Sequence, residues 1–263
     1  MTRGKNRWLV GLLSVAVVIA LAGVALAWLL TPLGPDLEAT EALRSTDEVD
    51  FREMDYGYEF TPVDDDPTVG LILYPGGRVD YRSYSLLARD LAERGYLVAV
   101  TEMPLNLAVL GTDRADEIID AHPEIVLWAV GGHSLGGAMA AKYAYENEGA
   151  VHGLALIAAY PPSGSDLSDR AISVTSIYAT LDGVANAERF LESGSVLPTS
   201  TVFARITGGN HAQFGAYGPQ PGDNDALISA EDQRWHTVNA IQEMLMPLRR
   251  RSGALDVPGR PAA

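Results

Sequence analysis

The feature that most constrains this chain is a run of six apolar residues that leads directly into a serine surrounded by glycines. Residues 125–130 read IVLWAV, and residues 131–137 read GGHSLGG before small helix-forming residues follow. An unbroken apolar run of this length is typical of a strand covered on both faces, as in parallel sheets. The G-x-S-x-G pattern at residues 132–136 therefore stands between a predicted buried strand and a predicted helix.

This position makes Ser134 a candidate nucleophile. A serine at a sharp strand-to-helix turn is held in a strained backbone conformation, with its hydroxyl above the edge of the sheet. The flanking glycines leave the room that so tight a turn needs, and the new helix points its first amides toward developing negative charge. The alternative interpretation is an ordinary glycine-rich turn with a capping serine.

The composition excludes several kinds of site. The length of 263 residues predicts one large domain with a short appendage. The chain has no cysteine, which excludes disulfides, thiolate metal ligands and a cysteine nucleophile. Its net charge of −15 argues against binding to nucleic acid. No predicted strand end gathers histidine with acidic residues at ligand spacing, so we expect neither a metal nor another cofactor.

The N-terminal segment predicts membrane targeting. Residues 8–30 contain no ionisable side chain and, at about 1.5 Å per residue, are long enough to cross a bilayer as a helix. Arg3, Lys5 and Arg7 precede this stretch, so the positive-inside rule predicts a single-pass protein with a cytoplasmic N-terminus and an extracytoplasmic catalytic domain. The lipid bilayer is then an expected partner. The alternative is secretion after cleavage of a signal peptide near residues 25–27.

The remainder of the chain alternates predicted strands and helices. Two short antiparallel strands are expected within residues 49–61, and the last helix begins near Ser229, with Asp232 completing a capping box. That helix is expected to turn Trp235, Val238, Ile241, Leu245 and Leu248 inward. The other strands are expected at residues 69–74, 96–100, 125–130, 154–159, 174–178 and 202–206. This alternation predicts an α/β fold with an open, mostly parallel, doubly wound sheet.

The expected organisation has five segments. They are a cytoplasmic N-terminus at residues 1–7, a transmembrane anchor at 8–30, a linker at 31–45, an α/β domain at 46–248 and a flexible C-terminal tail at 249–263.

Three polar residues follow predicted strands at one edge of this sheet. Ser134, Asp182 and His211 come after the strands at residues 125–130, 174–178 and 202–206, in that chain order. Ligands of open α/β sheets bind at the carboxyl ends of the strands, so these three side chains are candidates for one site. Asp182 precedes a glycine and has an alternative interpretation as a turn aspartate, with Glu102 as the next candidate acid.

This order and placement resemble the α/β-hydrolase superfamily, and most of all the compact, lid-poor serine hydrolases similar to dienelactone hydrolases, the α/β hydrolase fold-5 group. The resemblance covers residues 68–248. By position it implies Ser134 as nucleophile, His211 as general base and Asp182 as the acid that orients the histidine. The expected oxyanion donors are the amides of Leu135 and Gly77.

The first oxyanion loop departs from the family pattern. Residues 75–78 read PGGR, where the family usually has histidine before the glycine. The departure leaves two candidates for the oxyanion donor of this loop, the amide of Gly77 and the amide of Arg78. We also expect Arg78 to contact substrate, and Met103, Leu105 and Phe214 to wall an acyl pocket. About fourteen residues separate the strands at 154–159 and 174–178, too few for a lid with its own core.

These observations predict a membrane-anchored serine hydrolase that cleaves a carboxylic ester or related acyl bond of a small substrate. The alternatives are an acyltransferase that uses the same triad and a catalytically silent binding protein of the same fold. The sequence predicts no oligomeric state.

Overall fold

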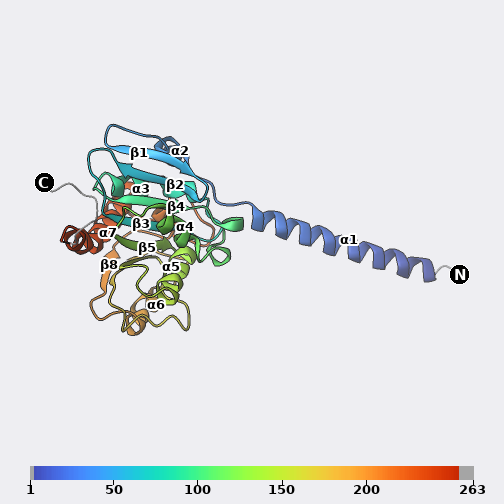
Figure 1. The fold of residues 1–263 in the computed structure, drawn as a ribbon. Helices are drawn as coiled ribbons and strands as arrows, with labels where there is room; N and C mark the ends of the chain where they lie inside the picture. The colour runs from blue at the N-terminus through green and yellow to red at the C-terminus, as the bar shows by residue number, and fades with distance from the viewer. Residues whose placement is uncertain (1–2, 255–263) are drawn as a thin grey trace. The chain divides into compact units, whose positions relative to one another are not determined.

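The structure is a computed structural model that describes residues 3–254 (Figure 1). The chain divides into two compact units, Met1–Pro32 and Leu33–Ala263. The first unit contains one helix, α1 (Arg3–Leu30). The second contains all the other helices and strands that the structure describes.

The structure does not support the expected transmembrane anchor at residues 8–30. Among the described residues, no helix combines the length and the apolar character that crossing a membrane requires.

The second unit is built around one eight-stranded sheet with the order β1-β2-β4-β3-β5-β6-β7-β8. β1 pairs antiparallel with β2 and β2 antiparallel with β4, and all the remaining neighbours are parallel. This confirms the predicted α/β fold with a mostly parallel sheet. The strands are β1 (Val49–Met54), β2 (Gly57–Pro62), β3 (Val69–Tyr74), β4 (Leu97–Thr101), β5 (Leu127–His133), β6 (Gly153–Ile157), β7 (Ser173–Ala179) and β8 (Val202–Ile206).

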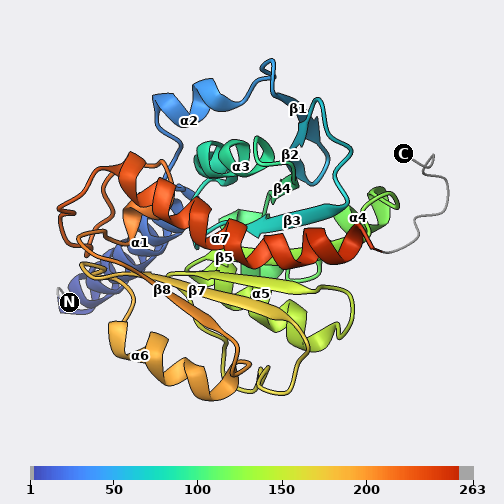
Figure 2. The ribbon, with the colours of Figure 1, turned by 90° about the vertical axis from the view of Figure 1, so that its left-hand side faces the viewer.

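Helices cover both faces of the sheet. α3 and α7 pack against one face and α4 and α5 against the other (Figure 2). The α-helices of this unit are α2 (Leu37–Ala42), α3 (Ser85–Ala92), α4 (Arg114–Ala121), α5 (Leu135–Glu146), α6 (Ala187–Glu192) and α7 (Ala230–Ser252). Short 3-10 helices lie at Tyr81–Tyr84, Pro104–Asn106, Ala108–Leu110, Ser193–Val196 and Ala212–Phe214.

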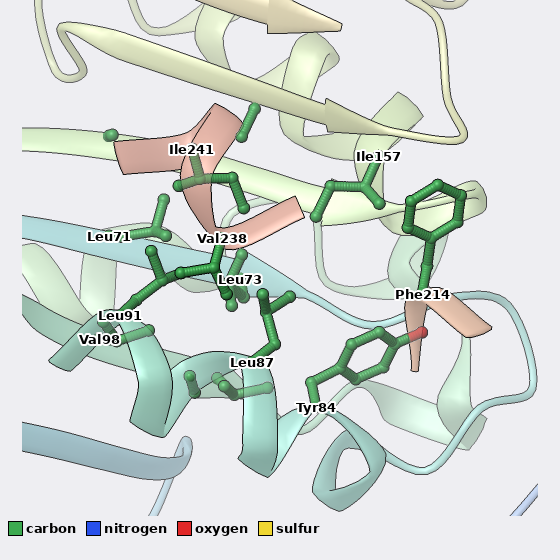
Figure 3. Packing of buried hydrophobic residues seen from close by; sticks show 14 of the residues in the cluster. Leu71, Leu73, Tyr84, Leu87, Leu91, Val98, Ile157, Phe214, Val238 and Ile241 are labelled. Atoms are coloured by element: carbon green, nitrogen blue, oxygen red, sulfur yellow. The ribbon is translucent and has the colours of Figure 1, made fainter. Parts of the chain in front are cut away.

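The central strands are buried on both faces, as their apolar runs predict. Leu71 and Leu73 of β3 face a core that includes Leu87 of α3 and Val238 of α7 (Figure 3). Ile72, between them in the sequence, belongs to the core on the α4 and α5 face. Successive side chains of a strand point to opposite faces, so one apolar run serves two cores.

Two segment boundaries differ from expectation. Residues 33–45 are not a free linker, because Leu33 forms a β-bridge with Val79 and Ala39 and Ala42 of α2 are buried. The final helix continues through Ser252, so the first residues of the expected tail at 249–263 are helical. Residues 255–263 lie outside the described part of the chain.

α7 confirms its predicted start but not its whole predicted face. The Ser229 hydroxyl accepts a hydrogen bond from the Asp232 amide at 3.0 Å, as a capping box requires. Val238, Ile241, Leu245 and Leu248 are buried. Trp235 is 57% exposed and its inward prediction was wrong, because the polar Gln233 and Thr237 are buried on the inner face of this turn.

β5 is shifted toward the serine relative to the prediction. It was expected to end at residue 130, but Gly131, Gly132 and His133 continue the pairing with β6 opposite Ala155, Leu156 and Ile157. Glycine does not break this strand because both of its neighbours, β3 and β6, hold it in register. Ser134 therefore comes directly at the carboxyl end of the sheet.

Candidate active site

Ser134 stands in a strained turn between β5 and α5. Its backbone has φ 53° and ψ −120°, a left-handed conformation that a non-glycine residue adopts at a cost. The Ser134 amide donates to the carbonyl of Ile157 at 2.9 Å, which ties the turn to the end of β6. The turn leaves Ser134 only half-buried at the edge of the sheet.

Close backbone approach makes the turn possible. A Cβ atom at Gly136 would lie 2.2 Å from the carbonyl oxygen of Tyr74 and 2.4 Å from that of Pro75. These atoms are backbone and cannot move aside as a flexible side chain would. Glycine at position 136 thus allows the start of α5 to pass against the end of β3.

Asp182 and His211 form a buried hydrogen-bonded pair. Nδ1 of His211 lies 2.7 Å from Oδ2 of Asp182, and the side chains are 1% and 0% exposed. The other carboxylate oxygen accepts hydrogen bonds from the amides of Val184 at 2.9 Å and Ala185 at 2.7 Å. A buried carboxylate needs such partners, and an ionised Asp182 requires Nδ1 of His211 to carry the hydrogen. Nε2 of His211 is then left as an acceptor.

The elbow and the histidine lie at the same edge of the sheet. The ring of His133, the residue before Ser134, lies 4.4 Å from the ring of His211, centroid to centroid. Within the described residues, Ser134 and His211 are not joined by a hydrogen bond. In unliganded enzymes this bond is often long and forms only with substrate present.

The loop after β3 distinguishes between the two expected oxyanion donors. The amide of Arg78 donates to the carbonyl of Asn106 at 2.7 Å, so it is already engaged. The amide of Gly77 meets no acceptor among the described residues. The Leu135 amide lies in the first turn of α5, where N–H groups have no partner within the helix. Of the two candidate amides on this loop, that of Gly77 therefore has no acceptor in the described structure, like the amide of Leu135, whereas that of Arg78 is engaged.

The residues expected to bind substrate do not form one wall. Met103 is 3% exposed and packs in the core on the α4 and α5 face, whereas Phe214 packs in the core on the opposite face. Leu105 is 53% exposed, with φ 53° in a short 3-10 helix. The ring of Phe214 lies 5.8 Å from that of His133 in the elbow, centroid to centroid. Arg78, on the loop after β3, is half-buried with φ 60°.

The edge carries no large insertion between β6 and β7. Residues 158–172, all of them described, contain neither a helix nor a strand. Over the described part of the chain, no group of three or more histidine and acidic residues is arranged to hold a metal ion.

Comparison with known proteins shows which family has this arrangement of strands and side chains. The model of the Alpha/beta hydrolase family matches residues 70–235, which span the sheet from β3 to β8 and include Ser134, Asp182 and His211. The chain belongs to the alpha/beta hydrolase family. This membership confirms the expected superfamily and supports a hydrolase-type enzyme acting on a small molecule. No curated protein matches the sequence.

Solved structures share the fold of this hydrolase at low sequence identity. A predicted CIB-like hydrolase from Thermoplasma acidophilum matches with a TM-score of 0.56 and 15% identity, over 74% of this chain and 99% of its own. TT1662 from Thermus thermophilus matches with a TM-score of 0.54 and 12% identity, over 75% of this chain and 98% of its own. At these identities the likeness concerns the fold alone.

Sequence reasoning missed two residues that support the hydrolase site. Asp223 accepts from the amides of Gly183 at 2.9 Å and Ala212 at 2.8 Å, so it joins the loops that carry the aspartate and the histidine. Gln233 of α7 is fully buried and bonds both the amide and the carbonyl of Asn210, at 3.0 and 2.7 Å. No pattern in the sequence marks either residue.

Proposed function

We propose that this hydrolase is a serine hydrolase that cleaves a carboxylic ester or related acyl bond through an acyl-enzyme intermediate. The observation that carries the proposal is the buried hydrogen bond between His211 and Asp182. It lies at the sheet edge where Ser134 stands in a strained turn. A buried histidine–carboxylate pair beside an activated serine is the arrangement that nucleophilic acyl transfer requires.

The roles follow from the chemistry of each group. Nε2 of His211 takes the proton of the Ser134 hydroxyl as its oxygen attacks the acyl carbon. The histidine then gives that proton to the leaving alcohol. In the second half, His211 takes a proton from the water molecule that attacks the acyl-serine and returns it to the Ser134 oxygen as the acid leaves. Asp182 keeps the hydrogen of His211 on Nδ1 and stabilises the imidazolium that forms.

The tetrahedral intermediates carry an oxyanion that needs preorganised donors. We assign this role to the amides of Leu135 and Gly77, which have no acceptor of their own in the described structure. Losing one such donor typically costs about 3 kcal/mol of transition-state stabilisation. The loop between β6 and β7 holds no helix or strand, which favours small substrates or acyl groups presented from a larger surface.

The test is hydrolysis of p-nitrophenyl butyrate by the wild type and by Ser134→Ala. The matched control is Ser163→Ala, which changes an exposed serine in the loop after β6. We expect Ser134→Ala to lose on the order of 10³-fold or more in kcat while the control keeps wild-type activity. Equal activity in all three proteins would contradict the proposal.

An acyltransferase that uses the same residues is the second candidate. The loop between β6 and β7 holds no helix or strand to form a lid over the acyl-enzyme, which favours hydrolysis. Product analysis with added alcohol acceptors separates the two: a hydrolase yields mainly free acid, and an acyltransferase yields mainly the new ester. A protein that binds p-nitrophenyl butyrate without turnover would instead be a silent binding protein.

We propose separately that residues 1–30 direct the hydrolase unit out of the cytoplasm. The support is the placement of Arg3, Lys5 and Arg7 before an uncharged stretch. A reporter enzyme that works only outside the cytoplasm should be active when it is fused after Leu248. A reporter that works only in the cytoplasm should be inactive in the same position. Fractionation and the N-terminal sequence of the mature protein then separate membrane retention from release after cleavage near Ala27.

A further inference from the structure

Tyr84 connects the nucleophile elbow to the oxyanion loop through two buried hydrogen bonds. Its hydroxyl accepts from the amide of Gly76 at 2.9 Å and lies 2.8 Å from Nδ1 of His133. Tyr84 and His133 are 2% and 1% exposed. A hydroxyl has one hydrogen to donate, and among the described residues Nδ1 of His133 is the acceptor within reach. When Tyr84 donates to Nδ1, the hydrogen of the His133 ring is on Nε2, a buried atom that meets no partner among the described residues.

The three groups fit together without spare room. A Cβ atom at Gly76 would lie 2.9 Å from Nδ1 of His133 and 3.0 Å from the Tyr84 hydroxyl. Gly76 directly precedes Gly77, the proposed oxyanion donor, and His133 directly precedes Ser134. The Tyr84 hydroxyl thus sets the distance between the two segments that must act on the same carbonyl group.

The surroundings of His133 keep it neutral. Burial holds the pKa of His133 well below its ordinary value, and the neighbouring His211 lowers that pKa further. Rings of Phe214, Tyr217 and Tyr84 lie within 6.4 Å of the His133 ring. A neutral ring 4.4 Å from His211 does not repel the imidazolium that the proposed mechanism forms there.

We propose that Tyr84 and His133 are a positioning pair that holds the Gly76–Gly77 oxyanion loop against the nucleophile elbow. The inference rests on the proposed serine-hydrolase function. The pair neither touches substrate nor transfers its proton. Its loss displaces the Gly77 amide, which matters more in the transition state, where the oxyanion exists, than in substrate binding.

The first experiment compares Tyr84→Phe with Tyr58→Phe, using p-nitrophenyl butyrate. Tyr58 is a matched control, because it is buried in the same core and its hydroxyl bonds the carbonyl of Tyr81 at 3.4 Å, away from the elbow. We expect Tyr84→Phe to lose about 10- to 100-fold in kcat with KM changed less than about threefold. Tyr58→Phe should keep wild-type kinetics. Equal kcat in the two variants would overturn the proposal.

The second experiment compares His133→Asn with His133→Leu, and it decides the matter if Tyr84→Phe does not fold. The asparagine side-chain oxygen can take the place of Nδ1 and accept from Tyr84, whereas leucine cannot. We expect kcat of His133→Asn to be at least tenfold higher than kcat of His133→Leu. The rising limb of the pH profile should stay where it is in the wild type. Equal loss in both variants, or a shifted limb in His133→Asn, would show that His133 acts in another way.

A fluorophosphonate separates this inference from the function on which it rests. Wild-type protein that is not labelled at Ser134 means that the proposed function itself fails. Wild-type protein that is labelled, together with a Tyr84→Phe variant labelled at the same rate, means that only the positioning role fails.

Discussion

Nδ1 of His211 lies 2.7 Å from Oδ2 of Asp182, and neither side chain is open to solvent. Because Asp182 also accepts two backbone hydrogen bonds, its carboxylate is fixed before substrate arrives. The pair therefore fixes the tautomer as well as the position of the histidine.

Asp182→Asn should fold and lose activity. The amide oxygen can keep both backbone hydrogen bonds. The NH₂ group then faces Nδ1 of His211 and favours a histidine with the hydrogen on Nε2, where the proposed base must accept. We expect kcat to fall by on the order of 10³- to 10⁴-fold, measured with p-nitrophenyl butyrate. Asp225→Asn, at an exposed aspartate, is the control. Full activity in Asp182→Asn would place the acid elsewhere, with Glu102 the next candidate to test.

Ser134→Ala and His211→Ala should not have additive effects. If both groups act in one proton-transfer step, removing either one abolishes the step, and the double variant loses hardly more than each single variant. The measurement is kcat for all three variants. Multiplicative losses in the double variant would mean that the two residues act independently.

Gly136→Ala should damage the elbow itself. The added Cβ would meet the backbone oxygens of Tyr74 and Pro75 well inside contact distance, so α5 or β3 must shift. We expect a loss of about 3 kcal/mol in the free energy of unfolding, together with loss of activity. Gly34→Ala is the control, because a Cβ there meets no atom within 4 Å. Urea denaturation of the two variants checks the difference; equal midpoints would contradict it.

A buried cluster away from the site predicts the pH dependence of stability. Nε2 of His122 and the hydroxyl of Tyr56 both bond Glu59, at 2.9 and 2.5 Å, and Nδ1 of His122 lies 2.9 Å from Glu124. The hydrogen bond to Glu59 raises the pKa of His122 despite burial, and Glu124 adds to this effect. Burial opposes ionisation of Glu59, but bonds from His122 and Tyr56 outweigh it and hold the pKa of Glu59 below its ordinary value.

The two shifts define one pH window. The stabilisation from His122 is complete below about pH 6.5 and is lost as pH rises through its raised pKa in the folded state. The stabilisation from Glu59 is present above about pH 4.3 and is lost as pH falls through its lowered pKa. Wild type should therefore lose more stability than His122→Gln between pH 5.5 and pH 9. Parallel urea midpoints over that interval would count against the cluster.

The sequence predicted the frame of the site because local patterns determine it. The apolar run before Ser134 and the polar residues after β7 and β8 place three side chains at one edge in any parallel sheet. His211 and Asp182 do meet there. The predicted end of β5 was three residues short, because pairing with β3 and β6 overrides the low strand preference of Gly131 and Gly132.

Contacts between residues that are far apart in the sequence could not be predicted from local patterns. The link between Tyr84 and His133 joins the 3-10 helix at Tyr81–Tyr84 to the end of β5, and no local pattern in the sequence reveals it. Asn106 accepts from Arg78 through a backbone carbonyl, which no side-chain pattern reveals. Met103 and Phe214, which were expected to line one acyl pocket, pack in cores on opposite faces of the sheet.

Covalent labelling by a fluorophosphonate, with the modified peptide identified by mass spectrometry, tests the central claim most directly. We expect one adduct, on the Ser134 hydroxyl, at a rate that falls on the order of 100-fold or more in His211→Ala. We expect no adduct in Ser134→Ala. An unlabelled wild type, or an adduct on another serine that persists in Ser134→Ala, would contradict the assignment of Ser134 as the nucleophile.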